Sequence, residues 1–209
     1  AIAQSNSLPN CLSTDAMDAG YLSSPFIFLI QVVFGAYALI VMLRFLFQAL
    51  RVDFHNPLSQ FVVRATSPLL RPMRKFIPGI ARMDIASLVL AWLVKSVELL
   101  LIILLSGNGM ILAAFIWAIP ALVSLTFTIF IAAMIILAIM SWIPSLQTHP
   151  LAWILRALTD PLLRPIRRYV PAPSGLDFSV MIAIVGLIFL RMLIIPPLAL
   201  LFGVPGGLL

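Results

Sequence analysis

The chain has 209 residues, of which 63% are hydrophobic and only 10% are charged, and its mean hydropathy is +1.16. A soluble domain cannot bury so much apolar surface, so the composition excludes a soluble globular protein and indicates an integral membrane protein. The net charge of +6 could suit nucleic acid, but most of the basic residues lie in two separate segments, so we expect no nucleic-acid partner.

Four apolar stretches are long enough to cross the hydrocarbon core of a bilayer, which takes about 20 helical residues. None of them alternates as barrel strands do, and open loops cannot lie in lipid, so all four are predicted to be helices. They cover about residues 25–47, 85–105, 118–141 and 178–201. The predicted fold class is therefore an all-α membrane protein with four transmembrane helices.

The first 24 residues are polar and contain neither a basic segment nor an apolar core, so they are predicted to form a flexible outer tail rather than a signal peptide. The single cysteine, Cys11, lies in this tail. A passive thiol is the simplest interpretation, and an intermolecular disulfide or lipidation stays open. In the first span, Arg44 lies near the inner boundary, where it is expected to anchor the helix by reaching lipid phosphates.

The segment 56–84 recurs 93 residues later as 149–177, and within it Thr66–Pro78 aligns with Thr159–Pro171 without a gap. The two copies share three prolines and three basic positions, which is hard to obtain by chance, so the chain is predicted to be a tandem duplication of a helical hairpin. The predicted units are an outer tail at 1–24, a first repeat at 25–105, a connection at 106–117, a second repeat at 118–203 and an outer tail at 204–209.

Each copy is predicted to begin with an amphipathic helix that lies in the plane of the membrane. In the first copy, Asn56 caps the helix and Pro57 is its first residue. The second copy begins behind His149 and Pro150 and carries Trp153 on the same pattern. The apolar face of the first helix is expected to hold Leu58, Phe61, Val62 and Ala65, opposite Ser59, Gln60 and Arg64.

A second short helix is expected to follow in each copy, restarted at Pro68 or Pro161 and bent at Pro72 or Pro165, so that each segment forms a rigid elbow. Three carboxylates are expected to act as helix caps at the starts of the helices that follow them. Pairing with an arginine of the same segment is the alternative for the residues before the apolar runs. The expected caps are Asp84, Asp160 and Asp177.

Ten of the thirteen Lys and Arg residues lie in the two repeated loop regions, and none lies in the terminal tails or in the central connection. By the positive-inside rule, both basic regions face the cytoplasm of a bacterial inner membrane and both termini face the periplasm. The amphipathic helices and elbows are expected to bind anionic lipid head groups or a partner protein. The residues expected to do so are Arg64, Arg71, Arg74, Lys75, Arg156, Arg164, Arg167 and Arg168.

Three charged residues, Lys95, Glu98 and Arg191, are predicted near the middle of the membrane, where a charge is costly and usually has a partner. Glu98 and Arg191 are 93 residues apart and so occupy equivalent repeat positions. We therefore hypothesise an ion pair between them across a pseudo-two-fold axis, with Lys95 nearby. A structural clamp, an ion or proton pathway and snorkelling without a partner all stay open.

The central connection contains a predicted outer turn at residues 106–109, followed by an interfacial segment or helical overhang at 110–117. Trp117 is expected in the head-group belt, and Pro120 is expected to break the helix. At the other end of the second repeat, Pro196 and Pro197 are expected to kink and end the fourth span.

No catalytic, phosphate-binding or metal-binding motif is visible, so we expect no enzymatic activity, no metal and no cofactor. His55 and His149 occupy adjacent rather than equivalent repeat positions, and we interpret both as interfacial residues. A haem-handling chaperone, which needs one of them as a ligand, is a minor alternative.

The motif from Asn56 to Asp84, with Thr66–Lys75 at its centre, and its second copy resemble the YggT family of bacterial and plastid membrane proteins. The resemblance covers residues 25 to 203 and implies the same layout of two repeats and two hairpins. Plastid relatives in that family are linked to cytochrome b6f assembly and haem attachment, and bacterial relatives to division, nucleoid and envelope organisation, osmotic stress or ion uptake. The resemblance implies a role of one of these kinds. It carries over no catalytic residues.

The sequence thus favours a non-enzymatic inner-membrane scaffold or assembly factor that acts through its two basic cytoplasmic elbows. Membrane lipids and a membrane-protein complex are the expected partners, and homo-oligomerisation stays open. The alternative is an ion transporter or channel component that uses Lys95, Glu98 and Arg191.

Overall fold

The computed structural model describes residues 14–50, 52, 56–75, 84–107, 110–169 and 178–205. These residues form helices and turns with no strand among them, which confirms the predicted all-α class. The elements are α1 (Thr14–Ala49), α2 (Pro57–Met73), α3 (Ile85–Leu105), α4 (Ala113–Trp142), a short 3-10 turn η1 (Pro144–Leu146), α5 (Pro150–Tyr169) and α6 (Phe178–Leu201).

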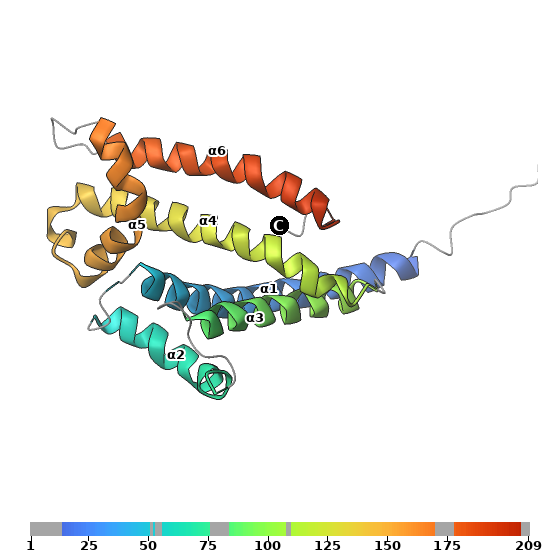
Figure 1. Ribbon diagram of the computed structural model, residues 1–209. Helices are drawn as coiled ribbons and strands as arrows, with labels where there is room; N and C mark the ends of the chain where they lie inside the picture. Colours follow the sequence, from blue (N-terminus) through green and yellow to red (C-terminus); the bar gives the residue numbers. More distant parts are fainter. Residues whose placement is uncertain are drawn as a thin grey trace, which may run out of the picture.

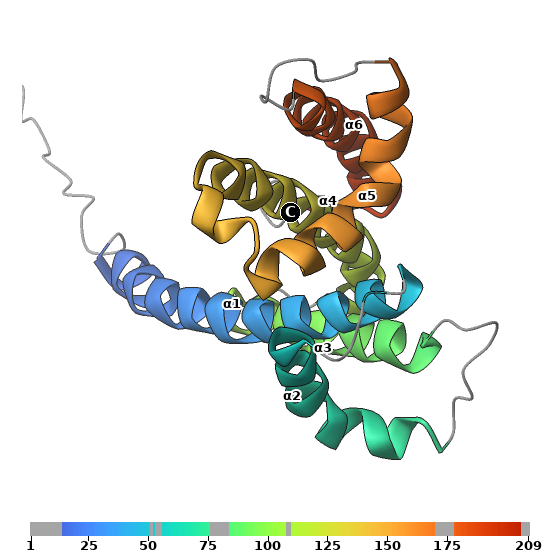
Figure 2. The ribbon, with the colours of Figure 1, turned by 90° about the vertical axis from the view of Figure 1, so that its left-hand side faces the viewer.

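Four of the helices are long and apolar enough to cross a membrane, as predicted: α1 from Ser23 onward, α3, α4 and α6. α3 packs between α1 and α4, and α4 packs in turn against α6. The two pairs, α1 with α3 and α4 with α6, cross each other at an angle (Figure 2). α2 and α5 lie toward one end of these long helices (Figure 1). The protein is therefore a multi-pass membrane protein built from two helix pairs.

The long helices differ from the prediction at three places. α1 begins at Thr14, so residues 14–24 are helical rather than part of a flexible tail. α4 runs through Pro120 without a break, and Pro196 and Pro197 do not end α6, which continues to Leu201 as the predicted span 178–201 does. Proline is tolerated within membrane helices because neighbouring helices and local backbone adjustment satisfy the carbonyl that it leaves unpaired.

Trp117 is buried within the protein. Its side chain is only 7% exposed, and its indole Nε1 donates a hydrogen bond to the carbonyl of Phe202 at 3.0 Å. The residue therefore joins the first turns of α4 to the end of α6, because an indole N–H needs an acceptor wherever it is buried.

α2 and α5 are each one continuous helix, so the prediction of two short helices in each copy is wrong. A proline in a helix interior costs roughly 3 kcal/mol. In α2, Val62 and Leu70 are both buried on the same face, on either side of Pro68, and the packing of this face offsets the cost. The prolines bend each helix without ending it, and the change of axis is visible in Figure 2.

Candidate functional site at the basic end of the molecule

α2 and α5 share four buried positions at helical spacing, each 93 residues from its counterpart in the other helix. These positions are Ser59, Val62, Thr66 and Leu70 in α2 and Ala152, Leu155, Thr159 and Leu163 in α5. α5 also buries Ile154 and Leu158, so its buried face is wider than that of α2. The duplication therefore preserved the centre of the face with which each amphipathic helix packs.

The predicted apolar face of α2 is only partly the buried one. Ser59 is fully buried, whereas Leu58 and Phe61 are 39% and 58% exposed. Small side chains such as Ser59 and Thr66 let the helix approach its neighbours closely, as they do between membrane helices. The exposed Leu58 and Phe61 leave a second apolar face, which suits contact with lipid.

The two amphipathic helices begin with the same kind of cap and touch each other there. The Oδ1 atom of Asn56 accepts a hydrogen bond from the backbone N–H of Leu58 at 3.1 Å, as predicted, and Nδ1 of His149 accepts one from the N–H of Leu151 at 3.2 Å. His149 thus replaces Asn56 as a cap, while His55 lies outside the described residues. Asn56 Nδ2 also donates to the Pro150 carbonyl at 2.8 Å, which joins the two repeats.

Arg44 does not reach out to lipid phosphates as expected. It is only 6% exposed, and its Nη1 atom donates hydrogen bonds to Thr66 Oγ1 at 2.6 Å and to the Val63 carbonyl at 3.0 Å. Its Nε atom lies 4.0 Å from Oδ2 of Asp84. Arg44 therefore ties α1 to α2, because a buried guanidinium needs acceptors and α2 supplies a carbonyl and a hydroxyl.

Asp84 occupies the residue before α3, but its side chain makes no capping hydrogen bond to the helix backbone. The carboxylate instead pairs with Arg74 and accepts a hydrogen bond from Ser87 Oγ at 2.8 Å. The alternative, pairing with an arginine of the same segment, is therefore what the structure shows. Burial alone would raise the pKa of Asp84, but the hydrogen bonds from Arg74 and Ser87, with the charges of Arg74 and Arg44, bring it below its usual value.

Asp160 is not a cap either, because it lies in the middle of α5. Its Oδ2 atom accepts hydrogen bonds from Nε and Nη2 of Arg164 at 3.3 and 3.2 Å, and its Oδ1 atom is 3.7 Å from Nη1 of Arg167. The continuity of α5 across Pro161 puts these residues on neighbouring turns. The third predicted cap, Asp177, lies outside the described residues.

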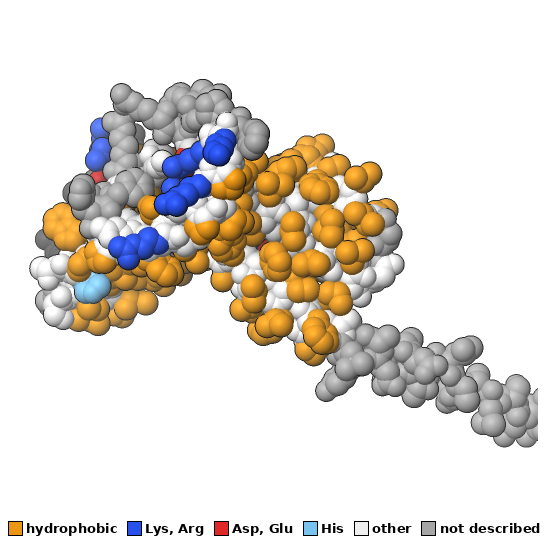
Figure 3. Space-filling model, turned by 90° about the horizontal axis from the view of Figure 1, so that it is seen from below, with side chains coloured by type: hydrophobic (Ala, Val, Ile, Leu, Met, Phe, Trp, Pro, Cys, Tyr) orange, Lys and Arg blue, Asp and Glu red, His pale blue; other side chains and the backbone are white. Residues whose placement is uncertain are grey.

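All eight basic residues predicted to bind lipid or a partner are exposed. They lie on α2, in the turn that follows it and on α5, and we call this part of the molecule the basic end. Seen from below, Lys and Arg side chains gather at one end, and the face beyond them is largely hydrophobic (Figure 3). This charge segregation is typical of the boundary between a lipid-embedded region and a membrane surface.

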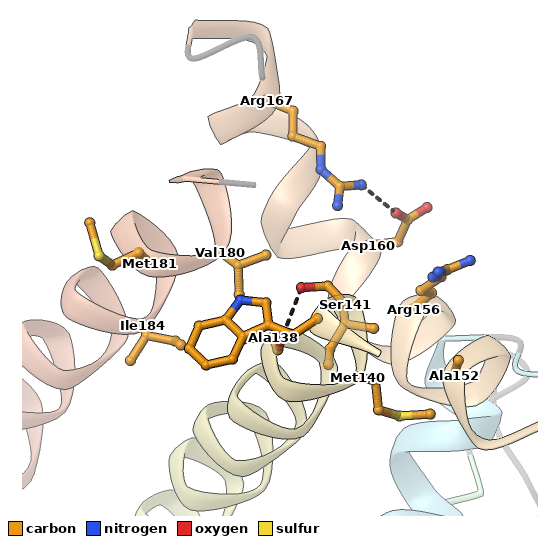
Figure 4. Close-up of a pocket in the computed structure, with 12 residues that line it drawn as sticks. Ala138, Met140, Ser141, Ala152, Arg156, Asp160, Arg167, Val180, Met181 and Ile184 are labelled. Atoms are coloured by element: carbon orange, nitrogen blue, oxygen red, sulfur yellow. Dashed lines mark hydrogen bonds and ion pairs between the residues drawn. The ribbon is translucent and has the colours of Figure 1, made fainter. Parts of the chain in front are cut away.

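The basic end contains one cavity in each repeat. In the second repeat, a cavity of about 560 Å³ opens between α4, α5 and α6, and its lining includes Arg156, Asp160 and Arg167 (Figure 4). In the first repeat, a cavity of about 440 Å³ is lined by Arg44, Gln48, Gln60, Val63, Arg64 and Arg74. Four pairs of lining residues are repeat equivalents: Arg44 and Leu137, Gln48 and Ser141, Val63 and Arg156, Arg74 and Arg167.

The sequence reasoning missed these cavities and the role of Arg44 in one of them. A signal was available in the repeat alignment, where Arg44 aligns with Leu137 whereas Thr66 aligns with another threonine, Thr159. A charge in one copy opposite an apolar residue in the other marks a position at which the two repeats differ in what they contact.

The three intramembrane charges do not form the predicted cluster. Glu98 Oε1 pairs with Nζ of Lys95 at 2.7 Å, whereas Nη2 of Arg191 donates to Ser124 Oγ on α4 at 3.2 Å. Among the described ion pairs none joins Glu98 to Arg191, so that prediction is wrong. Residues i and i+3 share a helix face, so Lys95 reaches Glu98 within α3, and α6 packs against α4, which places Ser124 beside Arg191.

The architecture and the site define a class: a helical, multi-pass membrane protein of two tandem repeats, each with a bent amphipathic helix at the basic end. The model of the CCB3/YggT family matches the chain twice, at residues 23–105 and 116–198, an offset that equals the repeat length. The chain therefore belongs to the CCB3/YggT family.

Curated relatives extend over most of the chain. An uncharacterized protein of Pseudomonas aeruginosa is 43% identical over 187 residues, which cover 88% of this chain and 95% of the relative. Uncharacterized protein YggT of Escherichia coli (strain K12) is 36% identical over 167 residues, covering 79% and 86%. An uncharacterized protein from the proC 3' region of Vibrio alginolyticus is 36% identical over 169 residues, covering 79% and 91%. No solved structure matches the chain.

Proposed function

We propose that the protein is a non-enzymatic scaffold or assembly factor of a bacterial inner membrane that docks a membrane-protein complex through its basic end. The observation that carries this proposal is the exposure of eight Lys and Arg side chains on α2, the turn that follows it and α5, two helices that share four buried positions. Because α2 and α5 also touch at their first residues, the two basic surfaces have a defined spacing. A surface of this kind suits a partner with two acidic patches at a matching distance.

The orientation follows from the same charges. Basic residues are retained on the cytoplasmic side during insertion, so the basic end faces the cytoplasm and both termini face the periplasm. Anionic head groups attract such a surface by about 1 kcal/mol per basic residue near the membrane. The docking surface is therefore held at the height of the head groups, where the cytoplasmic part of a membrane complex can meet it.

The test is purification of the protein in mild detergent from its native membrane, followed by identification of what travels with it. The variant changes Arg64, Arg71, Lys75 and Arg168 to Gln, because these exposed side chains make no ion pair among the described residues and their loss leaves the fold intact. A stoichiometric protein partner present with the wild type and absent with the variant supports docking. Loss of the partner also from a variant with the three arginines changed to Lys would show that guanidinium geometry, not charge, is read.

An ion transporter or channel component that uses the intramembrane charges is the second candidate. The observation that favours it is Oε2 of Glu98, which is buried and has no hydrogen-bond partner among the described residues. The candidate is weakened because, among the described residues, Glu98 pairs with Lys95 whereas Arg191 donates to Ser124. Proton or potassium flux in proteoliposomes that disappears on Glu98→Gln supports this candidate over the scaffold.

A further inference from the structure

The cavity of the second repeat has two ends of different chemistry. One end is formed by side chains of α5, namely Arg156, Asp160 and Arg167, with Ser141 beside them. The other end is an apolar wall contributed by the end of α4 and the start of α6, including Leu137, Val180, Met181 and Ile184. In Figure 4, Met181 and Ile184 lie on α6 across the cavity from the charged residues of α5. A molecule that fills the whole cavity is therefore an amphiphile.

The mouth of the cavity lies at the surface of the transmembrane helices. Trp142 and Met181, which line it, are 75% and 58% exposed, and both belong to helices long and apolar enough to cross a membrane. Its volume of about 560 Å³ falls within the range of roughly 300–1,000 Å³ that small-molecule sites occupy. A lipid from the same leaflet can thus enter sideways without leaving the membrane.

The charges select a phosphate. Two guanidinium groups, of Arg156 and Arg167, and the carboxylate of Asp160 line the polar end. The guanidinium of Arg156 makes no hydrogen bond or ion pair within the described chain, and Arg167 is 3.7 Å from the carboxylate of Asp160. Arginine donates paired hydrogen bonds that match the oxygens of a phosphate.

We propose that the cavity of the second repeat binds one anionic phospholipid, with its phosphate at Arg156 and Arg167 and one acyl chain along the wall between α4 and α6. Free phosphate is a poor occupant because most of the lining is apolar. This inference goes beyond the docking function and does not require it. Arg156 and Arg167 belong to the basic end and also line the cavity.

The first repeat shows why the site is confined to one copy. There, Arg44 takes the place of Leu137, and its guanidinium is already bound to Thr66 and to the Val63 carbonyl. The position that forms an apolar wall in the second repeat is thus occupied by a buried charge in the first. An acyl chain has no apolar surface to follow at that point.

The test is native mass spectrometry of the purified full-length protein in mild detergent, with dioleoyl phosphatidylglycerol added. Wild type is expected to retain one lipid, and Arg156→Gln with Arg167→Gln is expected to weaken its binding by at least about tenfold, because two charge-assisted contacts are lost. The matched control, Arg71→Gln with Arg168→Gln, removes the same charge from residues outside the cavity and should leave binding within about twofold of wild type.

A second variant tests the apolar end. Leu137→Arg places at this position the residue found in the first repeat, and it should abolish retention of the lipid while the protein stays monodisperse. Dioleoylglycerol, which has the chains but no phosphate, should bind at least about tenfold more weakly than phosphatidylglycerol.

Three outcomes overturn the inference: retention of lipid by the Arg156 and Arg167 double variant, equal loss in the Arg71 and Arg168 control, or displacement of the lipid by inorganic phosphate at equal concentration. A variant that loses a co-purified protein but keeps the bound lipid would inform the scaffold proposal and leave the lipid proposal unchanged. The two proposals therefore fail separately.

Discussion

The two repeats share a fold but differ in where they place their charges. In the first, the buried Arg44 and Asp84, together with the exposed Arg74, link α1, α2 and the start of α3. In the second, Leu137 replaces Arg44 and Asp160 replaces Ser67, so the carboxylate pairs with arginines of its own helix. Both repeats contain a cavity at the basic end, but the buried Arg44 lines that of the first repeat, whereas the apolar Leu137 lines that of the second. After a duplication, a few substitutions are thus enough to change the contacts that each copy makes.

The largest effect is expected from breaking the clamp of the first repeat. Asp84→Asn removes the carboxylate that faces two arginines, one of them buried, and should lower the free energy of unfolding by about 3 kcal/mol. Equilibrium unfolding in mixed micelles measures this loss. Asp160→Asn, which removes a carboxylate from exposed ion pairs of the second repeat, should cost less than about 1 kcal/mol. Equal losses in the two variants would contradict the difference between the repeats.

Lowering the pH should reproduce this loss of stability, because it protonates the carboxylate of Asp84. The folded-state pKa of Asp84 is lowered, so its contribution is present above its unfolded pKa of about 3.9 and is lost as the pH falls through the folded value. The free energy of unfolding should therefore decline as the pH falls below about 4. In unfolding experiments across this range, the Asp84→Asn protein should lack this part of the decline; an unchanged pH profile would assign the decline to other carboxylates.

Glu98 and Arg191 extend the comparison into the membrane, because equivalent positions have partners on different helices. Lys95→Met leaves Glu98, which is 3% exposed, without its cation and should lower the free energy of unfolding by about 2 kcal/mol. The exchange of Lys95→Glu with Glu98→Lys should restore most of it, since both residues lie within α3. The control is an exchange of Glu98→Arg with Arg191→Glu, which should recover none of the stability that either single change loses. Recovery in this exchange would support an ion pair between Glu98 and Arg191.

The smallest effect is expected at the helix caps, where the repeats use different residues for one purpose. His149→Asn introduces the cap of the first repeat and should change the free energy of unfolding by less than about 0.5 kcal/mol. His149→Ala removes the acceptor for the Leu151 N–H and should cost about 1 kcal/mol. Thermal unfolding monitored by circular dichroism can compare the two, and an equal loss in both would mean that the imidazole acts through packing rather than as a cap.

The four spans, the duplication and the grouping of the basic residues could be predicted from the sequence, because they depend on length, composition and spacing. The sequence also determined the cap of α2, since Asn56 followed by Pro57 is a local signal. The tertiary structure decided the rest of the site: Thr66 as the partner of Arg44, Ser124 as the partner of Arg191, and the cavity beside Leu137. The transmembrane helices are apolar on all sides, so their periodicity does not indicate which face meets a neighbour. Only the packing of one helix on another sets that rotation, and with it the pairs that a buried charge can form.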